Sequence, residues 1–448
     1  MPFHSDDRGF ANEHLLSPLP RVSAPPTAVL ALRERSGYQP FPVNAEETPR
    51  PALPATPPAQ PETLLAGLRA LPRSAWVLFA GMFLNKFGAF VVPFLTLYLT
   101  SQGYTVGEAG LAISAYGAGN LLASVLGGHL ADFLGRRGTI VLSMFSGAAA
   151  MLLLSQAKTL PAIMVLAALA GLTNECYRPA SHALLADLVP VARRLTAYAA
   201  MRLAFNAGFA FGPATAGFLS TIGYFWLFVG DAATSVLFGL VALMALPRSR
   251  HAQLDNATWS QALGTLRRDH KLHQLLLANF AIALLFFQTL SAYGLHVTHL
   301  GFSPAIYGAI VSMNGALIVL VELPLTSFTR RFPTQRVIAI GYLLCGLGYS
   351  LNAFAHTVPA LAACMILLTF GEMIAMPMAS AYLADLAPPE MRGRYMGIAG
   401  LTWSAALILG PALGMKLYTA HPPAYWTTCA ALGVFAAAVI WRVARPAR

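Results

Sequence analysis

Two segments of the sequence place Pro, Asp, Pro and Arg at the same spacing: RPASHALLADLVPVARR at 178–194 and MPMASAYLADLAPPEMR at 376–392. Adding 198 to a position in the first segment gives the matching position in the second. The register continues beyond both segments without a gap, and six pairs match in type: Pro179 and Pro377, Asp187 and Asp385, Pro190 and Pro388, Arg194 and Arg392, Gly212 and Gly410, Pro213 and Pro411. Because an apolar composition does not by itself place Asp or Arg, the agreement indicates an internal duplication.

The chain around this repeat is too apolar for a soluble protein. Of its 448 residues, 56% are apolar and only 10% are charged, whereas a soluble domain carries about 25% charged residues. Much of its surface must therefore face lipid. The basic residues, which give a net charge of +11, stand in small groups between apolar runs and form no aromatic-interleaved stripe. This arrangement argues against nucleic-acid binding.

Twelve apolar runs are each long enough to cross a bilayer, which takes roughly 20 residues. The runs are continuous and not alternating, so helices are favoured over barrel strands. The sequence predicts an all-α polytopic membrane protein with twelve transmembrane helices in two six-helix halves, near 75–99, 107–128, 138–157, 161–186, 196–220, 222–246, 273–297, 304–328, 335–355, 358–385, 395–418 and 424–442.

Arginine and lysine predict the orientation of these helices. With a cytoplasmic N-terminus, the inner loops carry nearly all the basic residues of the membrane region, and the outer loops carry only Lys158 and Lys416. Positively charged loops remain inside. Both termini are therefore expected in the cytoplasm, and the membrane is expected to be a bacterial-type inner membrane.

The halves are flanked and joined by polar segments. Residues 1–73 hold 14 of the 31 prolines and show no sustained periodicity, so a disordered Pro-rich cytoplasmic tail is expected there. The N-terminal half then covers 74–246 and the C-terminal half 273–443. A cytoplasmic linker at 247–272 and a short cytoplasmic tail at 444–448 complete the chain.

The loop between the second and third runs, GGHLADFLGRRGTI at 127–140, is similar to the signature loop of the major facilitator superfamily. The matching positions are Gly128, Leu130, Ala131, Asp132, Gly135, Arg136 and Arg137. On this loop and on the duplicated plan, the chain resembles a member of that superfamily over about residues 74–443. The resemblance implies the major facilitator fold and transport of a substrate bound between the two halves.

The same loop predicts an inner gate. Its glycines permit close packing at a helix end, and Asp132 can bond the arginines there. Asp187 and Asp385 end the fourth and tenth helices and are expected to join this gate with Arg194 and Arg392. The alternative is that the arginines only set the topology. The matching loop of the second half, LTSFTRRFPTQRV, is degenerate, because Arg330 stands in the register of Asp132.

The fifth run contains NAGFAFGPATAG at 206–217, which in part resembles the antiporter motif of the family. Gly208, Gly212, Pro213 and Gly217 match it, and alanines stand at 199 and 216 where two further glycines belong. Generic close packing of helices explains the small residues almost as well. The first run carries NKFGAF at 85–90 without the acidic motif of peptide symporters, which disfavours that class.

Seven ionisable residues fall inside the apolar runs, where each costs roughly 3 kcal/mol and usually lines a cavity or pairs. The resemblance implies that helices one, four, seven and ten border the central cavity. Candidate residues for substrate binding or proton coupling are Lys86, Glu175, Arg178, Arg202, Asn279, Gln288 and Glu372. Subtracting 198 places Glu372 level with Asn174, so Glu175 and Glu372 lie at similar depth in the two halves.

Alternatives remain open for several of these residues. Glu175 either takes part in proton coupling or substrate contact, or forms a structural salt bridge with Lys86 or Arg178. Arg202 either faces the cavity or extends its head group to the membrane surface. The remaining expectations are that Glu322 reaches Arg330 or Arg331, that Asp231 has no assignable partner, and that His129, His296 and His299 are ordinary loop or helix-end residues.

The sequence as a whole predicts a secondary active transporter that works by alternating access. The favoured version is a proton-coupled exporter of small amphipathic organic compounds, resembling drug:proton antiporters and acting as a monomer. The alternatives are a symporter or facilitator for sugars, acids or other metabolites, and a transporter-like sensor or scaffold. The expected partners are a small-molecule substrate, a proton or ion gradient and the lipid bilayer. No enzyme signature, cofactor motif or metal-ligand spacing is present, and the four cysteines are expected to be small buried side chains.

Overall fold

The structure is built entirely of helices in the part of the chain that it describes. The computed structural model describes residues 68–190, 193–248, 269–388 and 392–443, all within the compact unit Glu62–Arg448. The expectations for residues 1–67, for most of the linker at 249–268 and for 444–448 lie outside the described residues and stay predictions.

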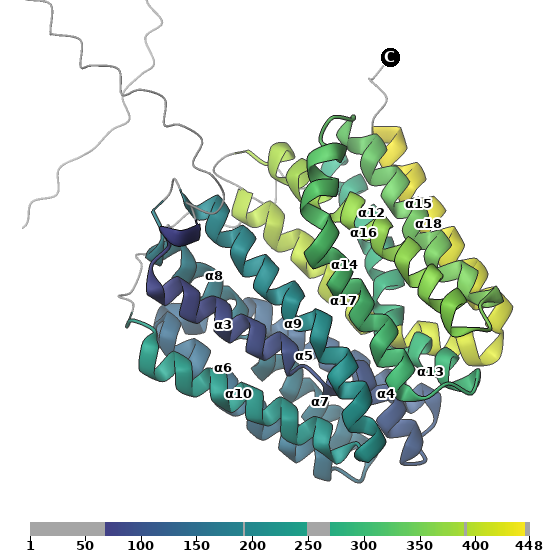
Figure 1. Ribbon diagram of the computed structural model, residues 1–448, viewed down its shortest axis with the longest axis horizontal. Coiled ribbons are helices and arrows are strands. Elements are labelled where there is room, and N and C mark those ends of the chain that lie inside the picture. The colour runs from purple at the N-terminus through teal and green to yellow at the C-terminus, as the bar shows by residue number, and fades with distance from the viewer. Residues whose placement is uncertain (1–67, 191–192, 249–268, 389–391, 444–448) are drawn as a thin grey trace, which may run out of the picture. The chain divides into compact units, whose positions relative to one another are not determined.

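Six spans form the first half, purple to teal in Figure 1. They are α3 with α4 (Arg73–Phe87, Val91–Ser101), α5 (Val106–Phe133), α6 (Arg136–Gln156), α7 with α8 (Leu160–Glu175, Tyr177–Leu188), α9 (Arg194–Ile222) and α10 (Phe225–Ala245). Six more, green to yellow, form the second half. They are α12 with η2 (His270–Phe286, Phe287–Leu290), α14 (Pro304–Thr329), α15 with η3 (Thr334–Ser350, Leu351–Phe354), α16 (Val358–Leu386), α17 (Arg392–Ala420) and α18 (Pro422–Val443), and the short α13 (Ala292–His299) follows η2.

These spans have the length and surface of membrane helices. Among the described residues, eleven are long and apolar enough to cross a bilayer; α9, with 29 residues, is the twelfth and packs between α3 and α14. Large apolar side chains remain exposed, including Val165 at 67%, Phe211 at 60% and Leu320 at 74%. An exposed apolar surface of this extent marks contact with lipid. The predicted twelve-helix membrane fold is confirmed.

The duplication extends to the helix boundaries. Adding 198 to 136, 160 and 194, where α6, α7 and α9 begin, gives 334, 358 and 392, where α15, α16 and α17 begin. The far ends agree as well, because the same addition carries Ile222 of α9 to Ala420 of α17. The two halves are therefore two copies of one six-helix plan.

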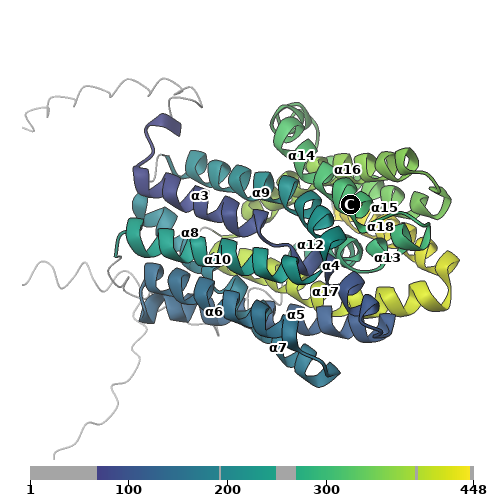
Figure 2. The ribbon, with the colours of Figure 1, turned by 60° about the horizontal axis from the view of Figure 1, so that its bottom comes forward.

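The two ends of the helices differ in charge. We call the end that carries Arg136, Arg194 and Arg330 the basic end, and the end that carries the turn glycines Gly103 and Gly301 the far end. Successive spans run alternately between them, as the chain in Figures 1 and 2 shows.

The halves touch toward the far end and separate toward the basic end between α5 and α17, which lie side by side in Figure 2. A Cβ added to Gly117 of α5 would lie 2.9 Å from the backbone of Leu407 in α17. Nearer the basic end, a Cβ on Gly128, Gly397 or Gly400 would meet open space. The space between these two helices therefore widens toward the basic end.

Tyr307 closes the interface at the far end. Its hydroxyl lies 3.0 Å from the carbonyl oxygen of Pro93 in α4 and 2.8 Å from that of Thr289 in η2. Its ring packs edge to face on Phe94, with centroids 5.1 Å apart. One buried tyrosine thus joins α14 and η2 of the second half to α4 of the first.

Candidate functional site: a charged central cavity

A cavity of about 920 Å³ lies between the two halves. Both halves line it, and Gly397 and Gly400, at the widening between α5 and α17, belong to its wall. Four charged side chains face it: Lys86 of α3, Glu175 of α7, Arg178 of α8 and Glu372 of α16. Sequence reasoning had selected these four, and the structure brings all of them to one cavity.

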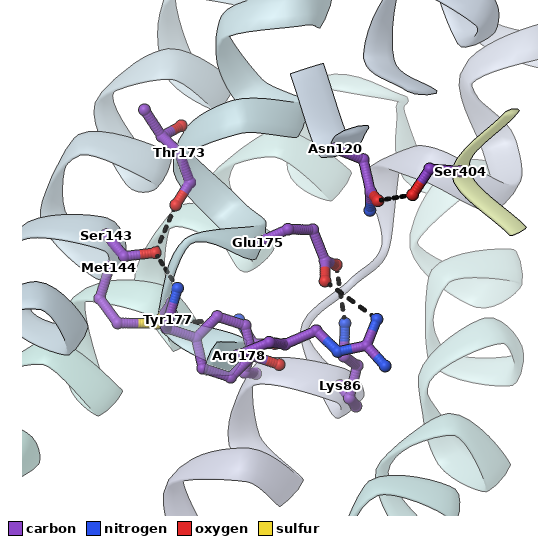
Figure 3. A network of polar contacts seen from close by, with 10 residues as sticks. Lys86, Asn120, Ser143, Met144, Thr173, Glu175, Tyr177, Arg178 and Ser404 are labelled. Atoms are coloured by element: carbon purple, nitrogen blue, oxygen red, sulfur yellow. Dashed lines mark hydrogen bonds and ion pairs between the residues drawn. The ribbon is translucent and has the colours of Figure 1, made fainter. Parts of the chain in front are cut away.

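Lys86, Glu175 and Arg178 form an ion cluster on the wall of the first half (Figure 3). The Lys86 ammonium lies 3.1 Å from Oε1 of Glu175, and the Arg178 guanidinium lies 3.4 Å from Oε2 of the same carboxylate. Lys86 and Glu175 are only 12% and 11% exposed, whereas Arg178 is 49% exposed. One carboxylate thus holds two cations, and the group keeps one excess positive charge.

The position of this cluster depends on a break in the fourth span. Ser143 of α6 inserts its hydroxyl where a helical hydrogen bond would run from Tyr177 to Thr173: it accepts from the Tyr177 N–H at 3.1 Å and donates to the Thr173 carbonyl. Pro179 adds to the break because it has no N–H for the carbonyl of Glu175. Insertion of a side chain into the ladder kinks a helix, and the kink divides α7 from α8 between Glu175 and Arg178.

Glu372 stands on the wall of the second half. Its carboxylate accepts a hydrogen bond of 2.8 Å from the amide of Asn314, which also donates to Thr369. No Lys, Arg or His of the described residues forms an ion pair with it. A partly buried carboxylate that lacks a cationic partner is costly to keep charged. Glu372 is therefore the candidate in this cavity for a group that binds and releases a proton.

Aromatic side chains cover much of the remaining wall. Trp403 packs edge to face on Phe286 and Phe287, with ring centroids 5.6 and 5.8 Å away. Lys86 lies 5.1 Å from the ring centroid of Phe205. Sequence reasoning missed Phe205 and Trp403, although the repeat offers a signal, since adding 198 to 205 gives 403 and both positions line the cavity.

A polar contact crosses the cavity region between the halves. Ser404 of α17 donates to the side-chain oxygen of Asn120 in α5 at 3.3 Å (Figure 3). Both residues line the cavity, and neither was selected from the sequence, because single Asn and Ser residues in apolar runs are common.

Asp231 has a partner that the sequence did not suggest. The first span is interrupted between α3 and α4, and the buried carboxylate of Asp231, 4% exposed, lies close to the backbone N–H groups of Phe90 and Val91 at the start of α4. A negative charge is favourable at the N-terminus of a helix. Asp231 therefore stabilises the interrupted first span, whose residues Lys86 and Ala89 line the cavity.

Two expectations about paired charges were wrong. Glu322 does not reach Arg330 or Arg331 but pairs with Arg202, at 2.5 Å, across the two halves. Arg202 accordingly does not line the cavity. The reason is that α9 and α14 lie against each other, so a residue of the other half is nearer than the next loop.

Asn279 and Gln288 also lie outside the cavity wall, contrary to expectation. Asn279 accepts a hydrogen bond of 2.6 Å from the hydroxyl of Tyr342. Gln288 donates to the carbonyl of Gly410 at 3.0 Å. Both amides bond inside the second half, because α12 turns Asn279 toward α15 and η2 turns Gln288 toward α17.

Arginines at the basic end bind helix ends within the first half. Arg136 pairs with Asp187 and donates to the carbonyl of Ala183 at 2.6 Å, and it also interacts electrostatically with Asp132. Arg194 donates to the carbonyl of Ala186 at 2.8 Å. Cations at a helix C-terminus are favourable, so both arginines stabilise the C-terminal end of α8.

The rest of the expected gate is less connected in this structure. Arg137 donates to the carbonyl of Leu243 at the end of α10. Gly135 is the turn residue before α6, with a φ of 77°. Asp385 is exposed at the end of α16, and the side chain of Arg392 lies outside the described residues. The gating role of these residues therefore stays a prediction.

The glycines of the antiporter-like motif serve close packing. A Cβ on Gly208 or Gly212 would lie 2.6 or 2.8 Å from a carbonyl oxygen of α3, and one on Gly217 would lie 2.9 Å from Ala305 of α14. A Cβ added to Gly308 of the same helix would meet the carbonyl oxygen of Pro213. Small residues permit such approaches, so α9 packs tightly against both α3 and α14.

The histidines and cysteines have structural environments. His296 is not an ordinary helix-end residue as expected: it is 7% exposed, and its ring nitrogens contact the Tyr418 hydroxyl and the Asn352 carbonyl at 3.3 and 3.1 Å. The cysteines are free and buried, as expected: Cys176, Cys345, Cys364 and Cys429. Within the four described stretches, no three His, Cys, Asp or Glu side chains come together in a way that would hold a metal ion.

A duplicated set of twelve membrane helices that encloses a charged cavity between its halves defines a transporter. The sequence pattern described as Major Facilitator Superfamily matches residues 76–298 and 275–448, which together span most of the chain. The protein belongs to the Major Facilitator Superfamily.

Named relatives span several transported substrates. The Na(+), Li(+), K(+)/H(+) antiporter of Planococcus maritimus is 27% identical, over 73% of this chain and 85% of its own. Multidrug resistance protein MdtH of Aeromonas salmonicida (strain A449) is 26% identical, over 74% of this chain and 84% of its own. The crystal structure of the nucleoside transporter NupG superposes with a TM-score of 0.72 at 16% identity, over 83% of this chain and all of that one, which supports the fold alone.

Proposed function

We propose that this transporter exports small organic compounds in exchange for protons, and that Glu372 carries the proton. The observation that supports the proposal is the contrast between the two cavity carboxylates. Glu175 is held by two cations, whereas among the described residues Glu372 has only the Asn314 amide as a hydrogen-bond donor at its carboxylate. Protonating Glu372 removes an uncompensated charge from a partly buried site, so this residue can bind and release a proton as its surroundings change.

The direction of exchange follows from the proposed orientation. The basic end is the cytoplasmic end by the positive-inside rule, which places both termini in the cytoplasm and the open side of the cavity toward it. An exporter loads its substrate from that side. The names of two relatives, a cation/proton antiporter and a multidrug resistance protein, favour exchange and export over uptake.

In alternating access, the far end of the cavity must open when the basic end closes. The Tyr307 contacts hold the far end shut, and the Arg202–Glu322 pair joins the halves nearer the basic end. We propose that the halves rock about the α9–α14 contact, that Asp132, Asp187 and their arginines complete the inner gate when the basic end closes, and that one monomer in an inner membrane suffices.

The test is transport by the purified protein in proteoliposomes with an imposed pH gradient, screened across dyes, sugars and amino acids. Glu372→Gln should lower the accumulation of substrate driven by the pH gradient by about tenfold or more. It should retain exchange of labelled for unlabelled substrate. Glu108→Gln, the same change at a partly exposed carboxylate that caps α5 outside the cavity, is the control. If gradient-driven accumulation persists in Glu372→Gln, this residue does not carry the coupled proton.

A further inference from the structure

The two walls of the central cavity carry opposite net charge. The first half contributes two cations and one anion, Lys86, Arg178 and Glu175, and so has one positive charge in excess. The second half contributes one charged residue to the wall, Glu372, and so has one negative charge. With His182 neutral, the lining as a whole has a formal charge of zero, separated between its two sides.

The excess cation on the first wall has free hydrogen-bonding capacity. Arg178 makes one hydrogen bond to Glu175, at 3.4 Å, lies 5.9 Å from the ring centroid of Phe205, and is half exposed to the cavity. A guanidinium has five N–H donors in a planar fork that matches a carboxylate or phosphate. Lys86 is less available, since it is nearly buried and lies closer to Glu175. Arg178 is therefore the group that a ligand anion would meet.

The anion on the second wall has free acceptor capacity. Asn314 occupies one acceptor position on Oε2 of Glu372, and an ionised carboxylate offers about four. A primary or secondary ammonium group of a ligand would satisfy the remaining positions and supply the charge that this carboxylate lacks. No described side chain supplies that charge as an ion pair.

An aromatic surface lies on the same wall as Glu372. Trp403 lines the cavity together with Phe286 and Phe287, and the three rings pack edge to face. All three rings are partly exposed, so they offer aromatic surface on which a planar ligand can stack. The volume of about 920 Å³ falls within the range of pockets that take drug-sized ligands.

From this arrangement we infer that the substrates are amphoteric compounds, with an anionic group and a basic amine at opposite ends of an aromatic body. The anionic group binds Arg178, the amine binds Glu372, and the aromatic body packs on Trp403. A compound with only an amine leaves Arg178 unpaired, and a compound with only an anionic group leaves Glu372 unpaired. Specificity then follows because a compound with only one of the two charges leaves a cavity charge unpaired and binds more weakly. The inference rests on the proposed transport function and narrows its substrate class.

Binding of three matched probes to the full-length protein in lipid nanodiscs tests this inference. The probes are ciprofloxacin, which carries a carboxylate and a piperazine amine at opposite ends of a planar ring system, its ethyl ester, which keeps only the amine charge, and its N-acetyl derivative, which keeps only the carboxylate charge. Fluorescence anisotropy of the quinolone measures each dissociation constant. Ciprofloxacin should bind about tenfold more tightly than either derivative.

Variants assign the preference to its two residues. Arg178→Gln should remove the advantage of ciprofloxacin over the ester, and Glu372→Gln should remove its advantage over the N-acetyl derivative. Arg178→Lys keeps the charge and should keep much of the preference. Arg330→Gln, an exposed arginine outside the cavity, should leave all three affinities unchanged. Thermal unfolding and size-exclusion chromatography identify any variant that fails to fold, and Arg178→Lys then decides for that position.

The inference is overturned if the ester or the N-acetyl derivative binds wild-type protein as tightly as ciprofloxacin, if none of the three binds, or if folded variants keep the wild-type ratios. These results are separable from the proposed function. Proton-driven transport without the charge preference would reject only the substrate class. The charge preference without proton-driven transport would reject only the coupling.

Discussion

Replacing Tyr307 by Phe should loosen the far-end closure without disturbing the packing beneath it. The phenylalanine ring keeps the edge-to-face contact with Phe94, at 5.1 Å between centroids. What is lost is one hydroxyl proton, placed between the carbonyl oxygens of Pro93 and Thr289 at 3.0 and 2.8 Å. The two carbonyls lie in different halves, so the change removes a polar link across the interface.

The magnitude follows from the number of bonds. A neutral hydrogen bond contributes about 1 kcal/mol net. Only the bond to Pro93 crosses between the halves, because Thr289 lies in the same half as Tyr307. The equilibrium should therefore shift by about 1 kcal/mol toward the far-end-open state, which is a factor of roughly 5 in its population. A shift of this size is measurable if the open state is a minor state of the wild-type protein.

Double electron–electron resonance between spin labels reports this shift directly. Gln102 and His421 are exposed at the far end of the first and second halves and are suitable positions, in a background without the four buried cysteines. The long-distance population should grow in Tyr307→Phe.

A neighbouring tyrosine provides the control. The ring of Tyr293 lies 6.2 Å from that of Tyr307, and its buried hydroxyl has no hydrogen-bond partner among the described residues. Tyr293→Phe should leave the distance distribution as it is. If both variants match the wild type, the Tyr307 hydrogen bonds do not hold the far end closed; if both shift alike, the effect belongs to general packing and not to these bonds.

Three further substitutions test the breaks and close contacts that shape the cavity. Ser143→Ala removes the hydroxyl inserted between Thr173 and Tyr177; it should lower stability by about 1–2 kcal/mol and weaken substrate affinity by moving the ion cluster, whereas an unchanged melting temperature and affinity would mean that the kink forms without Ser143. Asp231→Leu removes the carboxylate beside the start of α4 and should cost about 1 kcal/mol, while Asp231→Asn keeps a side-chain acceptor there and should cost less; equal thermal shifts in detergent would argue against a role at this helix end. Gly119→Ala would push a methyl group into the carbonyl of Ala168 and should cost about 1–3 kcal/mol, whereas Gly107→Ala on the same helix meets open space; similar melting temperatures for the two would show that α5 and α7 can separate at little cost.

Some features of the site were readable from the sequence because they depend on single residues in known places. Lys86, Glu175, Arg178 and Glu372 each stand inside an apolar run, where a charge is expensive and must face a partner or a cavity. The structure places all four on the cavity wall. The repeat register then placed Glu372 level with Asn174, the residue next to Glu175.

Other features depended on which helices become neighbours. Glu322 pairs with Arg202, 120 residues away, although Arg330 is only eight residues further along the chain. Asp231 lies beside the start of α4 because α10 packs beside the interrupted first span. Periodicity and charge in the sequence carry no information about such contacts, because they arise only once the helices have packed.

The sequence by itself determined the membrane location, the twelve spans and the two copied halves. These properties follow from the apolar length of each segment and from residue types repeated at one spacing, both of which are local quantities. The tertiary structure decided which half each polar side chain serves, where spans one and four break, and at which end the halves part. Those outcomes depend on helix-to-helix distances of a few ångströms, which hydroxyls, glycines and buried carboxylates set only after the chain has folded.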